Sequence, residues 1–149
     1  MQTTAHIIGY LLIFTLPFYF CLIMTNILLV EDEVKLARFM ELELNYEGYQ
    51  VSVAYDGLTA IMATRALQLD LIILDDTLPG SSGLEFCRRL RSMDKQVPII
   101  LLINKDEVSD RISVLDTTVN DYVIKPFNIE ELLTKVNAYL RRKPQSFEC

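Results

Sequence analysis

The sequence predicts an α/β protein in which five parallel strands form a doubly wound sheet covered by five helices. Short and almost wholly apolar runs recur along the chain, as expected of strands that are buried on both faces. Segments with helical periodicity lie between these runs, and such alternation is typical of a parallel sheet with right-handed crossovers. The chain of 149 residues is long enough for one domain of ordinary size.

The apolar runs define the five strands. Residues 27–30, 71–74 and 99–102 consist only of Ile, Leu and Val, which predicts three central strands. Residues 51–54 form a weaker run, so we expect this strand near an edge of the sheet. Residues 121–124 supply the fifth strand.

The helices are predicted from periodicity and from their stop signals. Leu36, Phe39, Met40 and Leu44 recur on one helical face, and Gly48 ends that helix. The other predicted helices span residues 56–67, 82–91, 105–115 and 129–142. Each lies between two strands or follows the last one, as the doubly wound arrangement requires.

The N-terminal segment differs from the rest of the chain. Residues 7–24 form an apolar run of 18 residues without charge, near the lower limit for a membrane span. It lacks the preceding basic residues and the following cleavage site of a signal peptide. It is either a membrane anchor, with Lys35 and Arg38 on the cytoplasmic side, or an extension upstream of the native start at Met24.

These observations divide the chain into three parts. Residues 1–25 are predicted to be an apolar extension, residues 26–142 the folded domain and residues 143–149 a C-terminal tail. We expect the domain in the cytoplasm, either free or anchored to the membrane through residues 7–24.

The composition excludes several classes of function. The net charge of −6 argues against nucleic-acid binding through a basic surface. A single histidine, His6, excludes a multi-histidine metal site. Three widely spaced cysteines exclude a disulfide framework.

Charged residues follow three of the predicted strands, at the end where ligands bind in doubly wound sheets. Glu31 and Asp32 follow the first strand, Asp75 the third and Lys125 the fifth. Carboxylates without His or Cys suit a hard cation such as Mg²⁺ or Mn²⁺, and their mutual repulsion favours binding one. With Lys125, they could hold a phosphoryl group, and Asp75 could accept it. The simpler interpretation, that each acidic residue only caps a helix, explains them singly but not together.

Five segments in order resemble the receiver domains of two-component response regulators, in particular those of the OmpR type. The similar segments are residues 27–33, 70–75, 78–80, 98–102 and 121–127, and the resemblance extends from about residue 26 to residue 142. It implies a flavodoxin-like fold with strand order 2-1-3-4-5.

The resemblance also implies roles for individual residues. Asp75 would take a phosphoryl group from a sensor histidine kinase, and Lys125 would contact the phosphoryl oxygens. Glu31, Asp32, Asp75 and the backbone carbonyl of Thr77 would hold Mg²⁺. The domain would therefore be a phosphoacceptor, capable at most of its own phosphorylation and dephosphorylation, rather than an enzyme.

The switch region departs from the family pattern. Tyr122 would be the aromatic switch residue, and the bond from Lys125 to Pro126 would be cis. Ile103 and Asn104, however, stand where the family has a hydroxyl residue and usually Ala. Either the Asn104 amide replaces the missing donor or phosphorylation is weakly coupled to conformation, and the lost contact favours weak coupling.

Self-association is expected to be weak. In OmpR-type receivers, salt bridges pair two subunits, and the corresponding pairs here are Arg111 with Glu131 and Asp121 with Lys135. Lys135 replaces the usual arginine, which removes the bidentate contact. Exposed pairs contribute only about 0–1 kcal/mol each.

The sequence leaves two functions open. A third, a metal-dependent phosphatase, is disfavoured because such enzymes need a second Asp two residues after the first, and Thr77 stands there. The first is a phosphorylated receiver that acts through contacts with an unknown output protein, without binding nucleic acid itself. The second is a pseudo-receiver, an interaction module that does not switch on phosphorylation.

Overall fold

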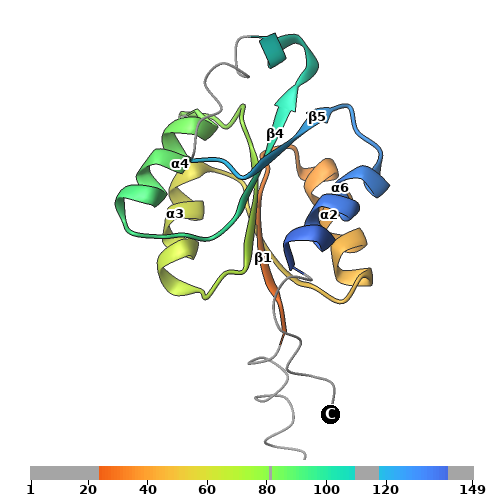
Figure 1. The fold of residues 1–149 in the computed structure, drawn as a ribbon, viewed down its shortest axis with the longest axis horizontal. Coiled ribbons are helices and arrows are strands. Elements are labelled where there is room, and N and C mark those ends of the chain that lie inside the picture. The colour runs from red at the N-terminus through yellow and green to blue at the C-terminus, as the bar shows by residue number, and fades with distance from the viewer. Residues whose placement is uncertain (1–23, 81, 110–117, 141–149) are drawn as a thin grey trace, which may run out of the picture.

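The computed structural model describes residues 24–80, 82–109 and 118–140, and in these ranges five parallel strands form one sheet in the order β2-β1-β3-β4-β5 (Figure 1). This order confirms the expected doubly wound arrangement. The strands are β1 (Asn26–Val30), β2 (Gln50–Ala54), β3 (Leu71–Asp75), β4 (Ile99–Asn104) and β5 (Asp121–Lys125). β2 lies at an edge, as its weaker apolar run predicted, and only its last residue is buried.

Helices cover both faces of the sheet. α2 (Val34–Tyr46) and α6 (Ile129–Leu140) lie on one face, and α3 (Gly57–Ala66) and α4 (Gly83–Ser92) on the other (Figure 1). Side chains cap three of them, since Asp56 accepts a hydrogen bond from the Thr59 N–H, Ser82 accepts one from the Glu85 N–H and Asn128 accepts one from the Glu131 N–H.

The described ranges therefore contain four α-helices rather than five. The helix expected over residues 105–115 begins as a single 3₁₀ turn, Lys105–Glu107, and most of its remainder lies outside the described residues. Residues 1–23 and 143–149 also lie outside them, so the predictions for the extension and the tail are not tested. Within residues 24–80, 82–109 and 118–140, no helix has the length and apolar character needed to cross a membrane.

The core has two halves, because successive side chains of a strand point to opposite faces of the sheet. Ile99, Leu101 and Ile103 of β4 belong to the half under α3 and α4. Ile100 and Leu102 belong to the half under α2 and α6. The half under α2 and α6 also contains every second apolar residue of β1 and of β3.

The alternation of β1, β3 and β5 continues to the carboxyl ends of the strands and decides where polar side chains lie. Ile27 and Leu29 of β1 lie in the half under α2 and α6, and so do Leu71 and Ile73 of β3 and Val123 of β5. The next residues in these three series are Glu31, Asp75 and Lys125. The strand pattern therefore directs all three toward the same face at the same edge of the sheet.

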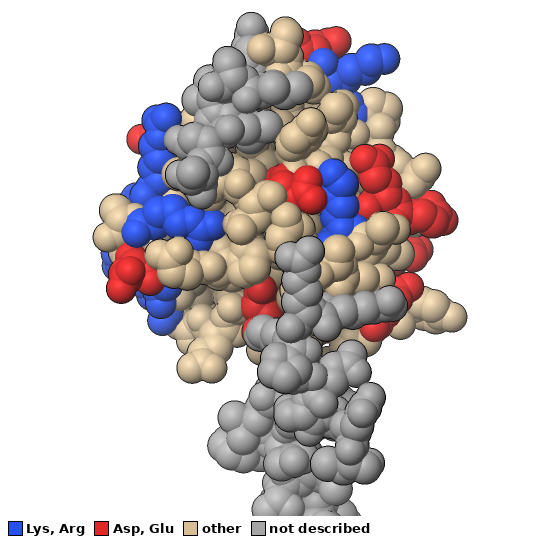
Figure 2. Space-filling model, in the orientation of Figure 1, with Lys and Arg blue, Asp and Glu red and all other residues tan. Residues whose placement is uncertain are grey.

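Charge is unevenly distributed over the surface. On the face shown in Figure 2, Lys and Arg gather mainly on the side of α3 and α4, whereas Asp and Glu gather on the side of α2 and α6. Charges of both signs are mixed within each region.

Candidate functional site

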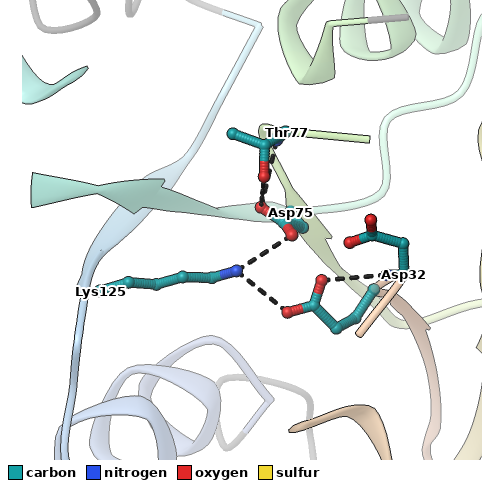
Figure 3. Close-up of polar contacts among 5 residues, drawn as sticks. Asp32, Asp75, Thr77 and Lys125 are labelled. Carbon is teal, nitrogen blue, oxygen red and sulfur yellow. Dashed lines mark hydrogen bonds and ion pairs between the residues drawn. The ribbon is translucent and has the colours of Figure 1, made fainter. Parts of the chain in front are cut away.

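Three buried or half-buried charged side chains meet at the carboxyl ends of β1, β3 and β5. The Lys125 ammonium Nζ lies 3.0 Å from Glu31 Oε1 and 3.0 Å from Asp75 Oδ2, so that it bridges the two carboxylates (Figure 3). Glu31 is 0% exposed and Asp75 2% exposed. The peptide bond from Lys125 to Pro126 is cis, as expected.

Asp32 and Thr77 complete the surroundings of Asp75. The Asp32 N–H donates to Glu31 Oε2 at 3.0 Å, while the Asp32 carboxylate is exposed. The Thr77 N–H and hydroxyl both donate to Asp75 Oδ1 at 3.1 Å (Figure 3). The hydroxyl contact was not predicted, because the family resemblance assigns a role only to the Thr77 carbonyl.

The acidic residues are arranged as a divalent cation would require. Glu31, Asp32 and Asp75 each offer a carboxylate oxygen, and these oxygens all lie within 4.8 Å of one another. An all-oxygen donor set of this kind suits Mg²⁺. The predicted residues therefore converge on one position and fit the expected ion.

Burial and the neighbouring charges set different protonation states for the two buried acids. Burial raises the pKa of Glu31 to about 8, and the adjacent Asp75 acts in the same direction. Burial also acts to raise the pKa of Asp75, but hydrogen bonds from Glu31, Lys125 and Thr77 outweigh it, so that the pKa lies below its usual value. At neutral pH without metal, Asp75 is therefore ionised while Glu31 mostly holds a proton.

Lys125 stays charged beside them. Burial alone would lower the pKa of Lys125, but contacts with Glu31 and Asp75 outweigh burial and raise it. The site therefore presents an ionised carboxylate and a fixed ammonium group next to each other.

The predicted switch residues lie on opposite faces of the sheet. Ile103 is fully buried under α3 and α4, and Tyr122 packs against the same cluster. Asn104 is half-buried, pairs in register with Lys125 and belongs to the series that faces α2 and α6. Ile103 and Tyr122 thus share one side of β4, and Asn104 occupies the other.

Two of the residues predicted to pair between subunits contact each other within the chain. Lys135 Nζ lies 3.0 Å from Asp121 Oδ1 and also donates to the Tyr122 carbonyl at 2.7 Å. Glu131 is exposed, and Arg111 lies outside the described residues. The proposed pairing of Arg111 with Glu131 therefore remains a prediction.

Asp76 is a third buried carboxylate, beside Glu31 and Asp75, and it was not predicted from the sequence. It is 2% exposed, and a Cβ atom on Gly83 would lie 2.9 Å from Asp76 Oδ1. Strand alternation is the signal that could have located it, because the residue after Asp75 must point to the opposite face. Its position beneath α4 keeps it away from the Glu31–Lys125 contact.

The described residues form a flavodoxin-like parallel sheet with three carboxylates and a lysine at its carboxyl edge, which is the arrangement that the sequence predicted for a receiver domain. The family model that matches residues 27–137 is described as the response regulator receiver domain. The chain therefore belongs to the response regulator receiver family, and its recognition from the sequence motifs is confirmed.

Relatives and solved structures agree with this assignment. The chain is 48% identical to the response regulator ArlR of Staphylococcus haemolyticus over 122 residues, which are 82% of this chain and 55% of ArlR. It is 50% identical to the transcriptional regulatory protein YkoG of Bacillus subtilis over 117 residues, 78% of this chain and 51% of YkoG. The chain thus spans about half the length of these relatives.

The folds of solved receivers are similar as well. The response regulator TrrA of Thermotoga maritima, solved in complex with Mg²⁺-BeF, superposes with a TM-score of 0.70 at 37% identity, covering 78% of this chain and 99% of TrrA. The receiver domain of TorR, the response regulator of the TMAO respiratory system, gives a TM-score of 0.73 at 36% identity, covering 79% of this chain and 98% of that domain. These findings support two-component signalling and give no support to the pseudo-receiver alternative.

Proposed function

We propose that Asp75 accepts a phosphoryl group from the phosphohistidine of a sensor histidine kinase, with Mg²⁺ held by Glu31, Asp32 and Asp75. The observation that carries this proposal is the Lys125 bridge, in which a half-buried ammonium group lies 3.0 Å from the carboxylate that would receive the phosphoryl group. The Thr77 carbonyl is the further oxygen ligand that we propose for the ion.

The state of Asp75 suits a nucleophile. Its lowered pKa keeps the carboxylate ionised at neutral pH, and the Thr77 donors fix Oδ1. A carboxylate oxygen attacks phosphorus while the phosphorus–nitrogen bond of the phosphohistidine breaks, and the imidazole nitrogen leaves with the electron pair and takes up a proton. An acyl phosphate on Asp75 and a neutral histidine are the products.

Lys125 would stabilise the transferred group. Its ammonium carries a charge that is already positioned, so phosphoryl oxygens can contact it without rearrangement. Bound Mg²⁺ would supply a second positive charge and orient the oxygens of the phosphoryl group. The same groups would support phosphorylation from a small acyl phosphate and hydrolysis of the product by water.

Signal output is proposed to pass through protein contacts between the receiver and an output protein. YkoG is named a transcriptional regulatory protein, and this chain matches about half of it. We propose that residues 26–142 act as the receiver, without contacting nucleic acid directly and on the cytoplasmic side of the membrane. Residues 1–25 are proposed to lie outside the receiver fold.

Phosphorylation can be tested by intact-mass measurement after incubation with acetyl phosphate and Mg²⁺. We expect the mass of one phosphoryl group to be added, and the addition to be lost with EDTA or in Asp75→Asn. Asp76→Asn is the matched control, since it changes the neighbouring buried carboxylate and should keep the addition. Circular dichroism verifies that both variants are folded. An unchanged mass with Mg²⁺ present, or an addition that persists in Asp75→Asn, would overturn the proposal.

A further inference from the structure

The two last residues of β4 present their side chains to different surroundings. Ile103 is 0% exposed in the apolar cluster under α3 and α4, so its side chain is committed to the core. Asn104 follows the series of Ile100 and Leu102, which faces α2 and α6. Glu31, Asp75 and Lys125 belong to the corresponding series of their own strands, so Asn104 lies on the face of the functional site.

The strand register places Asn104 where a phosphoryl group on Asp75 would extend. Asp75 pairs with Leu102 across β3 and β4, and Asn104 pairs with Lys125 across β4 and β5. Two residues of a strand span about 6.6 Å, so Asn104 lies beyond the level of Asp75 and beside Lys125. The Asp75 carboxylate reaches toward this level, since Asp75 Oδ2 lies 3.0 Å from Lys125 Nζ.

The Asn104 amide is available for such a contact. Asn104 occupies the N-cap position of the 3₁₀ turn Lys105–Glu107, where Asn commonly caps, yet its side chain makes no capping hydrogen bond. Asn104 and Lys125 also line the same cleft of about 580 Å³, together with Phe127. Asn104 therefore borders an open space that it shares with the lysine that would bind the phosphoryl oxygens.

We propose that the side-chain amide of Asn104 donates a hydrogen bond to an oxygen of the phosphoryl group on Asp75. This inference rests on the proposed function. The contact replaces the hydroxyl donor that Ile103 cannot supply. Asn104 and Tyr122 lie on opposite faces of the sheet. The Asn104 contact therefore holds the phosphoryl group without moving the apolar cluster against which Tyr122 packs.

The test measures the affinity for beryllofluoride, a phosphoryl mimic, by calorimetry at a saturating Mg²⁺ concentration. Asn104→Ala removes the donor, and Asn104→Leu removes it while keeping a side chain of similar size. We expect both variants to bind beryllofluoride about tenfold more weakly, as for the loss of one hydrogen bond to a charged group. Asn45→Ala, which removes an exposed amide on α2, is the matched control and should bind as the unaltered chain does.

A second measurement separates hydrogen bonding from a general disturbance of the site. Affinity for Mg²⁺ alone should be the same in all variants. Full affinity in Asn104→Ala would overturn the inference, and so would full affinity in Asn104→Leu, which would indicate a role of shape alone. An unaltered chain that neither binds beryllofluoride nor is phosphorylated would instead overturn the proposed function, and this inference with it.

Discussion

Binding of Mg²⁺ should release a proton from Glu31, because a carboxylic acid must lose its proton to become a good metal ligand. Burial raises the pKa of Glu31 to about 8, and Asp75 adds to this effect. The Lys125 ammonium at 3.0 Å opposes burial without overcoming it. Asp75 has a lowered pKa and is already ionised, so it contributes no proton near neutral pH.

The size of the effect follows from the pKa of Glu31. With a value of about 8, the protonated fraction is about 0.9 at pH 7 and about 0.1 at pH 9, and the protons released on binding should follow these fractions. Apparent Mg²⁺ affinity should rise about tenfold between pH 7 and pH 9 and become nearly constant above pH 9.

The same shift affects stability without metal. The pKa of Glu31 is about 8 in the folded state and 4.5 in an unperturbed glutamate, so the folded state binds more protons than the unfolded state between these values. The free energy of unfolding should therefore fall as the pH rises through this window. The stabilising effect of the proton bound to Glu31 is fully present only below about pH 4.5.

Calorimetry in two buffers with different ionisation enthalpies, at pH 7 and at pH 9, measures the released protons directly. Glu31→Gln is the control variant, because it keeps the shape of the side chain but cannot titrate. It should bind Mg²⁺ more weakly, with no proton release and little dependence on pH. Equal affinities at both pH values in the unaltered chain, or no release at pH 7, would refute the reasoning.

Four further predictions concern stability, switching, self-association and domain limits. Gly83→Ala should destabilise the domain by about 1–3 kcal/mol in chemical denaturation, because the new Cβ would lie 2.9 Å from the backbone and side chain of Asp76. Ile103→Thr should enlarge the change in amide exchange that beryllofluoride causes around β4 and β5, and an equally large change in the unaltered chain would contradict weak coupling. Sedimentation should show mainly monomer, and a tight dimer that survives high salt and Glu131→Lys would reveal another surface. A chain that starts at Met24 should unfold cooperatively, and loss of cooperativity would assign the preceding residues to the core.

The sequence was sufficient to predict which charged residues meet at the site. Glu31, Asp75 and Lys125 are far apart in the chain, but each stands at the end of an apolar run. Parallel strands bring their carboxyl ends to one edge, so the runs alone imply that these side chains converge. Their protonation was not predictable in the same way, because it depends on the burial of Glu31 and on the position of Lys125 between the two carboxylates.

Contacts that depend on the packing of neighbouring elements could not be derived from the pattern. The charges of Asp121 and Lys135 were recognised, but only the positions of β5 and α6 show that these residues pair within the chain. Strand alternation gives the face on which Asp76 lies, but not its burial beneath α4, next to Gly83. A local sequence pattern indicates neither the partner of a charge nor its depth.

Side chains of β4 alternate between the two faces of the sheet, and this alternation makes the two interpretations of the switch region compatible. The Asn104 amide can replace the missing donor while phosphorylation remains weakly coupled to conformation. A donor on the face of Asp75 can bind the phosphoryl group, whereas a donor on the other face can also act on the cluster that contains Tyr122. Asn104 has the first position, and Ile103 fills the second with an apolar side chain. A ligand shifts a conformational equilibrium only through contacts that differ between the two states. Binding of the phosphoryl group and coupling to Tyr122 should therefore be separable in this receiver, with affinity governed by residue Asn104 and the conformational response by residue Ile103.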